Sequence, residues 1–149
     1  RLDTLINLRG EIGQLVERML DHGASSTQIT HIITQLNDHT VCRVIELVLA
    51  DKGDPGVPFT WLCFGSEGRR EQTLHTDQDN GILFEARDAA EAADIRQRLL
   101  PIAQQINQHL AACGFTLCKG NIMAGNPDLC LSRAAWTRRF AAFIREATP

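Results

Sequence analysis

The sequence predicts an α/β domain, in which a small mixed β-sheet with packed helices follows an N-terminal helical hairpin. Two observations carry this prediction. Apolar residues recur at helical spacing over the first 53 residues, and short β-forming runs alternate with long helical stretches after them. We therefore expect a helical hairpin over residues 1–53, packed on an α/β core over residues 54–149.

The hairpin is predicted from one apolar stripe and two helix-end signals. The stripe residues, at steps of three and four, are Leu5, Leu8, Ile12, Leu15 and Met19. Gly23 suits the end of the first helix, and Ser25 with Gln28 offers a capping box for a second helix that ends near Gly53. The stripe either packs on this second helix or forms the seam of a homodimer through the N-terminal helices.

The core is predicted from residue type and from the glycines that separate the runs. The expected elements are strands over residues 59–64 and 82–84, a helix over 89–112, a strand over 115–118, and a helix that begins at Ser132. The long helix contains no glycine, and we expect it to bend near Pro101.

Composition narrows the classes of function. The formal net charge of -3 and a pI of about 5.9 disfavour a surface that coats nucleic acid. The five cysteines are odd in number and form no Cys-x-x-Cys pair, which favours free thiols in a reducing cytoplasm over disulfides or zinc. No apolar run approaches the ~20 residues of a membrane span. We therefore expect a cytoplasmic protein without membrane contact.

One polar segment, GSEGRREQTLHTDQDN at residues 65–80, lies between the first two predicted strands. Asp77 and Asp79 lie two residues apart near its end, so in an extended chain their side chains share a face. Their mutual repulsion is relieved by a divalent cation, and Mg²⁺ prefers one or two carboxylates with phosphate oxygens and water. The alternative is a solvated acidic turn that leads into the strand.

Gly65 and Ser66 open this segment directly after a predicted strand. A glycine there lets the backbone approach a ligand closely, and backbone N–H groups with the Ser66 hydroxyl suit a phosphate. Gly-Ser alone is a turn. A strand, Gly-Ser, about ten residues, Asp-x-Asp and a second strand together form a more specific pattern.

Residues 65–66 with 77–79 resemble the signature of DNA polymerase β-like nucleotidyltransferases. Residues 68–79 are similar to the corresponding string of PII uridylyltransferase and glutamine-synthetase adenylyltransferase. The whole segment most resembles the nucleotidyltransferase domain that occurs beside CBS pairs and cyclic-nucleotide-binding modules in bacterial signalling proteins. A second block over residues 118–127, followed by Trp136 and Phe140, supports the same family.

The resemblance implies a role for each matching residue. Gly65 and Ser66 would hold the nucleoside triphosphate, and Asp77 and Asp79 would be the catalytic residues and the ligands of Mg²⁺ or Mn²⁺. Arg69 would bind a phosphate, or else form a salt bridge that holds the loop. The implied reaction moves NMP from an NTP to a protein or small-molecule acceptor, with regulatory domains adjacent and a helical domain beyond residue 149.

The sequence departs from this class at a third carboxylate, which active members carry on a later strand. Residues 115–118 contain no acid, and the nearest candidates, Glu85 and Asp128, have no motif support. Two rival functions therefore stay open: a catalytically weak or inactive nucleotide-sensing regulatory module, and an interaction domain that docks partners through its hairpin.

Overall fold

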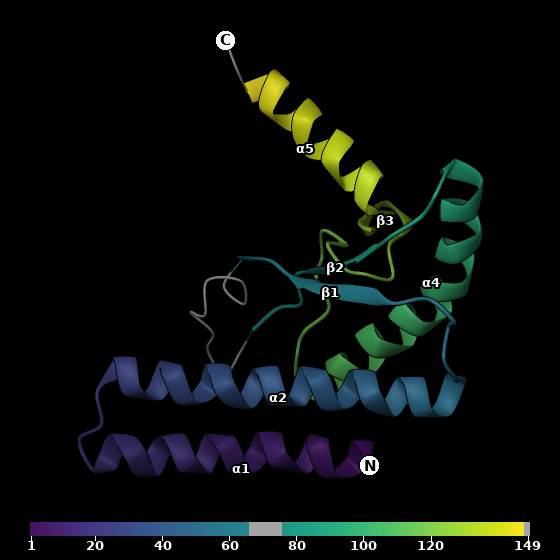
Figure 1. Cartoon of the computed structure of the whole chain (residues 1–149). Helices are drawn as coiled ribbons and strands as arrows, with labels where there is room; N and C mark the ends of the chain where they lie inside the picture. The colour runs from purple at the N-terminus through teal and green to yellow at the C-terminus, as the bar shows by residue number, and fades with distance from the viewer. Residues whose placement is uncertain (66–75, 148–149) are drawn as a thin grey trace.

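The computed structural model describes residues 1–65 and 76–147. Within these residues the chain is mixed α/β, with four helices and one three-stranded sheet, as predicted (Figure 1). In chain order the elements are α1 (Leu2–Asp21), α2 (Ser26–Lys52), β1 (Phe59–Cys63), β2 (Asn80–Phe84), α4 (Ala89–Ala112), the 3₁₀ helix η1 (Pro127–Leu129), β3 (Cys130–Ser132) and α5 (Arg133–Ala147). No helix among them is long and apolar enough to cross a membrane.

Helices α1 and α2 run side by side and form the predicted hairpin (Figure 1). The capping box is present: the Gln28 backbone N–H donates to Ser25 Oγ at 3.2 Å, and the Ser25 N–H donates to Gln28 Oε1 at 2.9 Å. Leu5 and Ile12 are buried in clusters shared with α2, whereas Leu15 is 37% exposed. The apolar stripe of α1 therefore packs mainly on its own hairpin partner.

The sheet has the strand order β1-β2-β3. Strand β1 is antiparallel to β2, with Trp61 opposite Ile82, and it matches the strand predicted over residues 59–64. Strand β3 is parallel to β2, with Ser132 opposite Phe84. A parallel pair needs a long crossover, and α4 supplies most of it.

The strand predicted over residues 115–118 is wrong. Among the described residues, Thr116 makes one isolated bridge to Asp77, and no ladder follows. Phe115 is fully buried, but in the cluster that α1 and α2 share with α4, so its burial does not require it to lie in a strand. Gly114, at φ +100°, turns the chain out of α4 just before it.

The third strand is β3, which the sequence did not reveal. Its three residues are too few to show an alternating pattern. Its last residue, Ser132, was predicted to begin the final helix. This prediction is confirmed, because Ser132 Oγ accepts the Ala135 N–H at 3.2 Å. One residue therefore ends β3 and caps α5.

Helix α4 joins the two halves of the core. Residues of its first half, including Ile95 and Leu99, pack with Phe84 of the sheet, and Ile106 in its second half packs with Val44 of α2. The helix changes direction along its length (Figure 1), and the predicted helix range with its internal proline is confirmed. The sheet strand that the polar segment enters, β2, therefore packs on a helix that also contacts the hairpin.

Candidate functional site

The segment that leads into β2 places its two aspartates on one outward side. Over residues 76–80 burial alternates: Thr76, Gln78 and Asn80 are at most 4% exposed, whereas Asp77 is exposed and Asp79 is half-buried. This alternation is that of an extended chain. The carboxylates therefore share a face, and the side chains between them point into the protein.

Backbone hydrogen bonds hold this segment on both edges. On one edge the Phe64 N–H donates to the Asp79 carbonyl oxygen at 2.8 Å. On the other edge the Gln78 N–H donates to the Thr116 carbonyl at 2.8 Å, and the Asn80 N–H donates to that of Ile122 at 3.1 Å. The two carboxylates thus stand on a backbone whose position is fixed from both sides.

Gly65 lies against the Asp79 carboxylate. Its φ is +59°, and a Cβ at this position would be 2.7 Å from Asp79 Oδ2. The structure therefore brings together the glycine after β1 and the acid before β2, two of the predicted site residues. The predicted ligand-binding residues Ser66 and Arg69 lie outside the described residues.

A buried network of three side-chain amides supports the carboxylates from beneath. Asn107 Nδ2, on α4, donates to Gln78 Oε1 at 2.8 Å and to Asn80 Oδ1 at 3.0 Å. Gln78 Nε2 donates to the carbonyl oxygens of Asn107 at 2.8 Å and Phe115 at 3.1 Å. Buried amides with several partners fix a single arrangement, because each lost bond leaves a desolvated polar group.

The network also holds the loop of the second sequence block. The Ala124 N–H donates to Asn80 Oδ1 and the Gly125 N–H donates to Asn107 Oδ1, both at 2.8 Å. No motif in the sequence singles out these amides. The available signal was the alternation of acid and amide over residues 77–80, which places both amides on the face opposite the acids.

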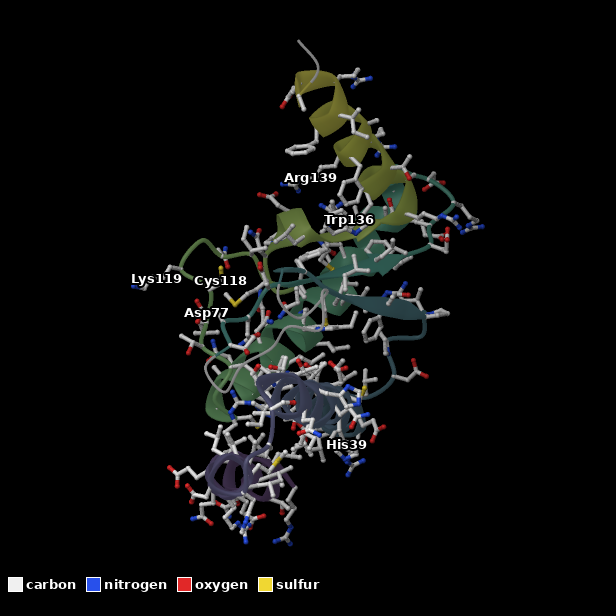
Figure 2. All side chains as sticks on the ribbon, turned by 90° about the vertical axis from the view of Figure 1, so that its left-hand side faces the viewer. His39, Asp77, Cys118, Lys119, Trp136 and Arg139 are labelled. Carbon is white, nitrogen blue, oxygen red and sulfur yellow. The ribbon has the colours of Figure 1, made fainter. Side chains whose placement is uncertain are left out.

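One basic residue near the carboxylates was also missed. Lys119 is exposed and follows Thr116, the bridge partner of Asp77, by three residues. Figure 2 shows Asp77, Cys118 and Lys119 on the same side of the molecule. An ammonium group on this loop adds positive charge where a triphosphate would bring negative charge.

Neither candidate for a third carboxylate joins the pair. Glu85 follows the far end of β2 and accepts a hydrogen bond from Arg133 at 3.3 Å. Asp128 lies in η1, and its backbone N–H donates to Asn126 Oδ1. Among residues 1–65 and 76–147, no three His, Cys, Asp or Glu side chains are grouped to hold a metal ion.

The residues present nevertheless suit a magnesium ion. Asp77 and Asp79 offer hard carboxylate oxygens on one face, and Mg²⁺ takes its remaining ligands from water and phosphate. The absence of a side chain at Gly65 leaves room beside Asp79 Oδ2 that a Cβ would fill.

A mixed α/β core with two carboxylates on one face, beside the glycine that follows β1, fits the nucleotidyltransferase-like domain that the sequence resemblance implies. The chain belongs to the family described as Putative nucleotidyltransferase DUF294, which matches residues 10–149. The match covers most of α1 and all the later elements, so the hairpin is part of the family's common region. No curated protein and no solved structure matches the chain.

Proposed function

We propose that this chain is a Mg²⁺-dependent nucleotidyltransferase domain that moves NMP from an NTP to a hydroxyl of a protein or small-molecule acceptor. The observation that carries the proposal is the placement of Asp77 and Asp79 on one outward face, with Asp79 against the Gly65 backbone. Family membership supports the same kind of activity.

In the proposed reaction the acceptor oxygen forms a bond to the α-phosphorus. The bond from that phosphorus to the bridging oxygen breaks, pyrophosphate leaves, and the hydroxyl proton passes to water. Asp77 and Asp79 would hold the metal, and bound Mg²⁺ supplies positive charge to the triphosphate oxygens. Gly65, Ser66, Arg69 and Lys119 would contact the phosphates, the last as an addition from the structure.

The sequence resemblance also supports proposals about the fold of the domain and about the domains beside it. It supports a polymerase β-like fold for residues 54–149 behind a hairpin domain at 1–53, a relationship to PII uridylyltransferase, and adjacent CBS or cyclic-nucleotide-binding domains in bacterial signalling. A C-terminal helical domain would complete the nucleotide cleft. A homodimer through the N-terminal helices stays a prediction, for which Leu15 is the most exposed residue of the stripe.

The second candidate is a regulatory module that binds nucleotide without turnover. It is favoured by the residue that faces Asp77 across the isolated bridge, because that residue is Thr116 and not an acid. The two candidates share the metal and nucleotide site and differ only in whether pyrophosphate is released.

Calorimetric titration of the chain with ATP and UTP, with and without Mg²⁺, tests the shared site. We expect Mg²⁺-dependent binding that is lost in the double variant Asp77→Asn/Asp79→Asn. The matched control, Asp21→Asn/Asp51→Asn, removes the same charge from exposed helix positions and should bind as the wild type does. Equal binding by the site variant and the wild type would refute the assignment.

Turnover separates the two candidates. Transfer of labelled nucleotide to a hydroxyl acceptor, with matching pyrophosphate release, establishes the transferase. Tight Mg²⁺-dependent binding without pyrophosphate release, in the chain extended by its natural C-terminal segment, establishes the sensing module. We expect the extended chain to bind NTP more tightly than residues 1–149. A completed cleft excludes water, and water would otherwise screen the charge contacts with the phosphates.

A further inference from the structure

A polar cavity lies at the opposite end of β2 from the two aspartates. It encloses about 260 Å³ between the first two turns of α4 and the first two turns of α5. Its lining comprises Ala86, Arg87, Asp88, Ala89, Ala92, Arg96, Ser132, Ala134, Ala135 and Arg138. Because Asp77 and Asp79 precede β2 and this cavity follows it, the two sites share no described residue.

The cavity has an excess of positive charge. Three arginines line it against one carboxylate, that of Asp88, whose Oδ1 accepts the Glu91 N–H at 2.8 Å. Arg87 is neutralised in part by its ion pair with Glu91. The side chains of Arg96 and Arg138 form no ion pair or hydrogen bond with any residue in the described part of the chain.

An unsatisfied donor on one of these arginines indicates a missing acceptor. Arg96 Nε is buried and has no hydrogen-bond partner in the described structure. A buried N–H without an acceptor is unfavourable, and more so when the donor is charged. A bound anion would supply that acceptor and would also compensate the charge of Arg138.

The backbone at the N-termini of α4 and α5 adds further hydrogen-bond donors to this cavity. The first N–H groups of α4 and α5 have no acceptor within their own helices, and Ala89 and Ala134 carry such groups at the cavity wall. Two helix N-termini at the wall of one cavity add partial positive charge to that of the guanidinium groups.

We propose that this cavity binds the phosphate group of inorganic phosphate or of a small phosphate monoester. Arg96 and Arg138 are its principal charged contacts, and the N-termini of α4 and α5 supply neutral donors. The volume is below that of pockets for drug-sized ligands, roughly 300–1,000 Å³, and therefore suits a phosphate with a small substituent.

The test is calorimetric titration of the 149-residue chain with two probes, inorganic phosphate and glycerol 3-phosphate. We expect saturable binding of at least one probe. Arg96→Gln and Arg138→Gln should each weaken it about tenfold, the usual cost of one hydrogen bond to a charged group. Arg145→Gln, an exposed arginine later on α5, is the matched control and should leave affinity unchanged.

The outcomes distinguish inorganic phosphate from a phosphate monoester as the ligand, and distinguish this cavity from the site at Asp77 and Asp79. Tighter binding of glycerol 3-phosphate assigns the cavity to monoesters, and equal or tighter binding of inorganic phosphate assigns it to the free anion. Asp77→Asn/Asp79→Asn should bind both probes as the wild type does, whether or not the proposed transferase is correct. Arg96 is half-buried, so its substitution can lower stability, and thermal unfolding is therefore recorded for each variant. Arg138 is exposed, so we expect Arg138→Gln to change phosphate affinity without a change in stability. Absence of saturable binding, or wild-type affinity in Arg138→Gln, would overturn the proposal.

Discussion

The Asp79 carboxylate lies directly against the backbone of Gly65, because a Cβ on that glycine would be only 2.7 Å from Asp79 Oδ2. The glycine also has a φ of +59°, a conformation that other L-residues adopt at a cost of about 1–2 kcal/mol. The backbone conformation therefore favours glycine at this position, and an added Cβ would make the Asp79 carboxylate shift. The Asp79 carboxylate therefore packs on the chain just after the end of β1.

The first prediction concerns Gly65→Ala. The added methyl group must displace the Asp79 carboxylate, so we expect Mg²⁺-dependent NTP binding to weaken at least tenfold, with a loss of about 1–2 kcal/mol in unfolding free energy. Calorimetry and urea unfolding measure the two effects. Gly10→Ala is the control, since nothing lies within 4 Å of its added methyl and a helix gains about 0.5–1 kcal/mol from alanine. Wild-type NTP affinity in Gly65→Ala would contradict the placement of nucleotide beside Asp79.

The second prediction concerns Asn107→Ala. This change removes the amide that joins Gln78, Asn80 and the Gly125 N–H, and leaves buried polar groups without partners. We expect a loss of about 2–4 kcal/mol in the free energy of unfolding. Gln108→Ala, the exposed neighbour on α4, should change it by less than about 0.5 kcal/mol. Similar urea midpoints for the two variants would show that the amide network contributes little to stability.

Local signals in the sequence predicted much of this fold. The capping box of Ser25 and Gln28 and the strand that became β1 depend on neighbouring residues, and both are present in the structure. The alternation that sets Asp77 and Asp79 on one face also follows from adjacent positions. Such features can be inferred because the physics that forms them acts over a few residues.

The features that the sequence did not reveal depend on contacts between distant segments. Asn107 meets Gln78 across 29 positions, and no periodicity in either segment indicates the partner. Phe115 was assigned to a strand because a buried aromatic residue looks alike whether it packs on a sheet or on a hairpin. Arg96 and Arg138 converge only because α4 and α5 begin beside the same end of the sheet.

The third prediction concerns Arg9, which connects the hairpin to the carboxylate segment. Its guanidinium carbon lies 4.8 Å from the centroid of the Phe115 ring, and its Nη1 donates to Asn37 Oδ1 at 2.7 Å. The carbonyl of Phe115 in turn accepts a hydrogen bond from Gln78. Arg9→Met keeps the apolar stem and loses the charge contacts, so we expect about 1–3 kcal/mol lower unfolding free energy.

Arg18→Met is the matched control for this change, because Arg18 is an exposed arginine on the same helix. Urea unfolding compares the two variants. If Arg9→Met and Arg18→Met unfold at the same urea concentration, the contacts of Arg9 with Phe115 and Asn37 do not stabilise the domain.

The last prediction concerns Cys130 and alkaline pH. Cys130 is fully buried in β3, and burial raises the pKa of its thiol from 9.0 to about 11, although the nearby Arg96 acts in the opposite direction. Between about pH 9 and about pH 11 the unfolded chain releases this proton while the folded chain keeps it. The contribution to stability is therefore complete below pH 9 and is lost as the pH rises toward the folded-state pKa. The Cys113 pKa is also raised by burial and adds a loss in the same direction.

Urea unfolding at about pH 8 and about pH 10.5 measures this loss. The chain has no tyrosine, so no phenol titrates in this range. Cys130→Ala removes the thiol, and its unfolding free energy should fall less between the two pH values than that of the wild type. Cys42→Ala, at an exposed position on α2, should fall as much as the wild type does. An equal fall in Cys130→Ala and Cys42→Ala would show that the buried thiol of β3 does not set the alkaline limit of stability.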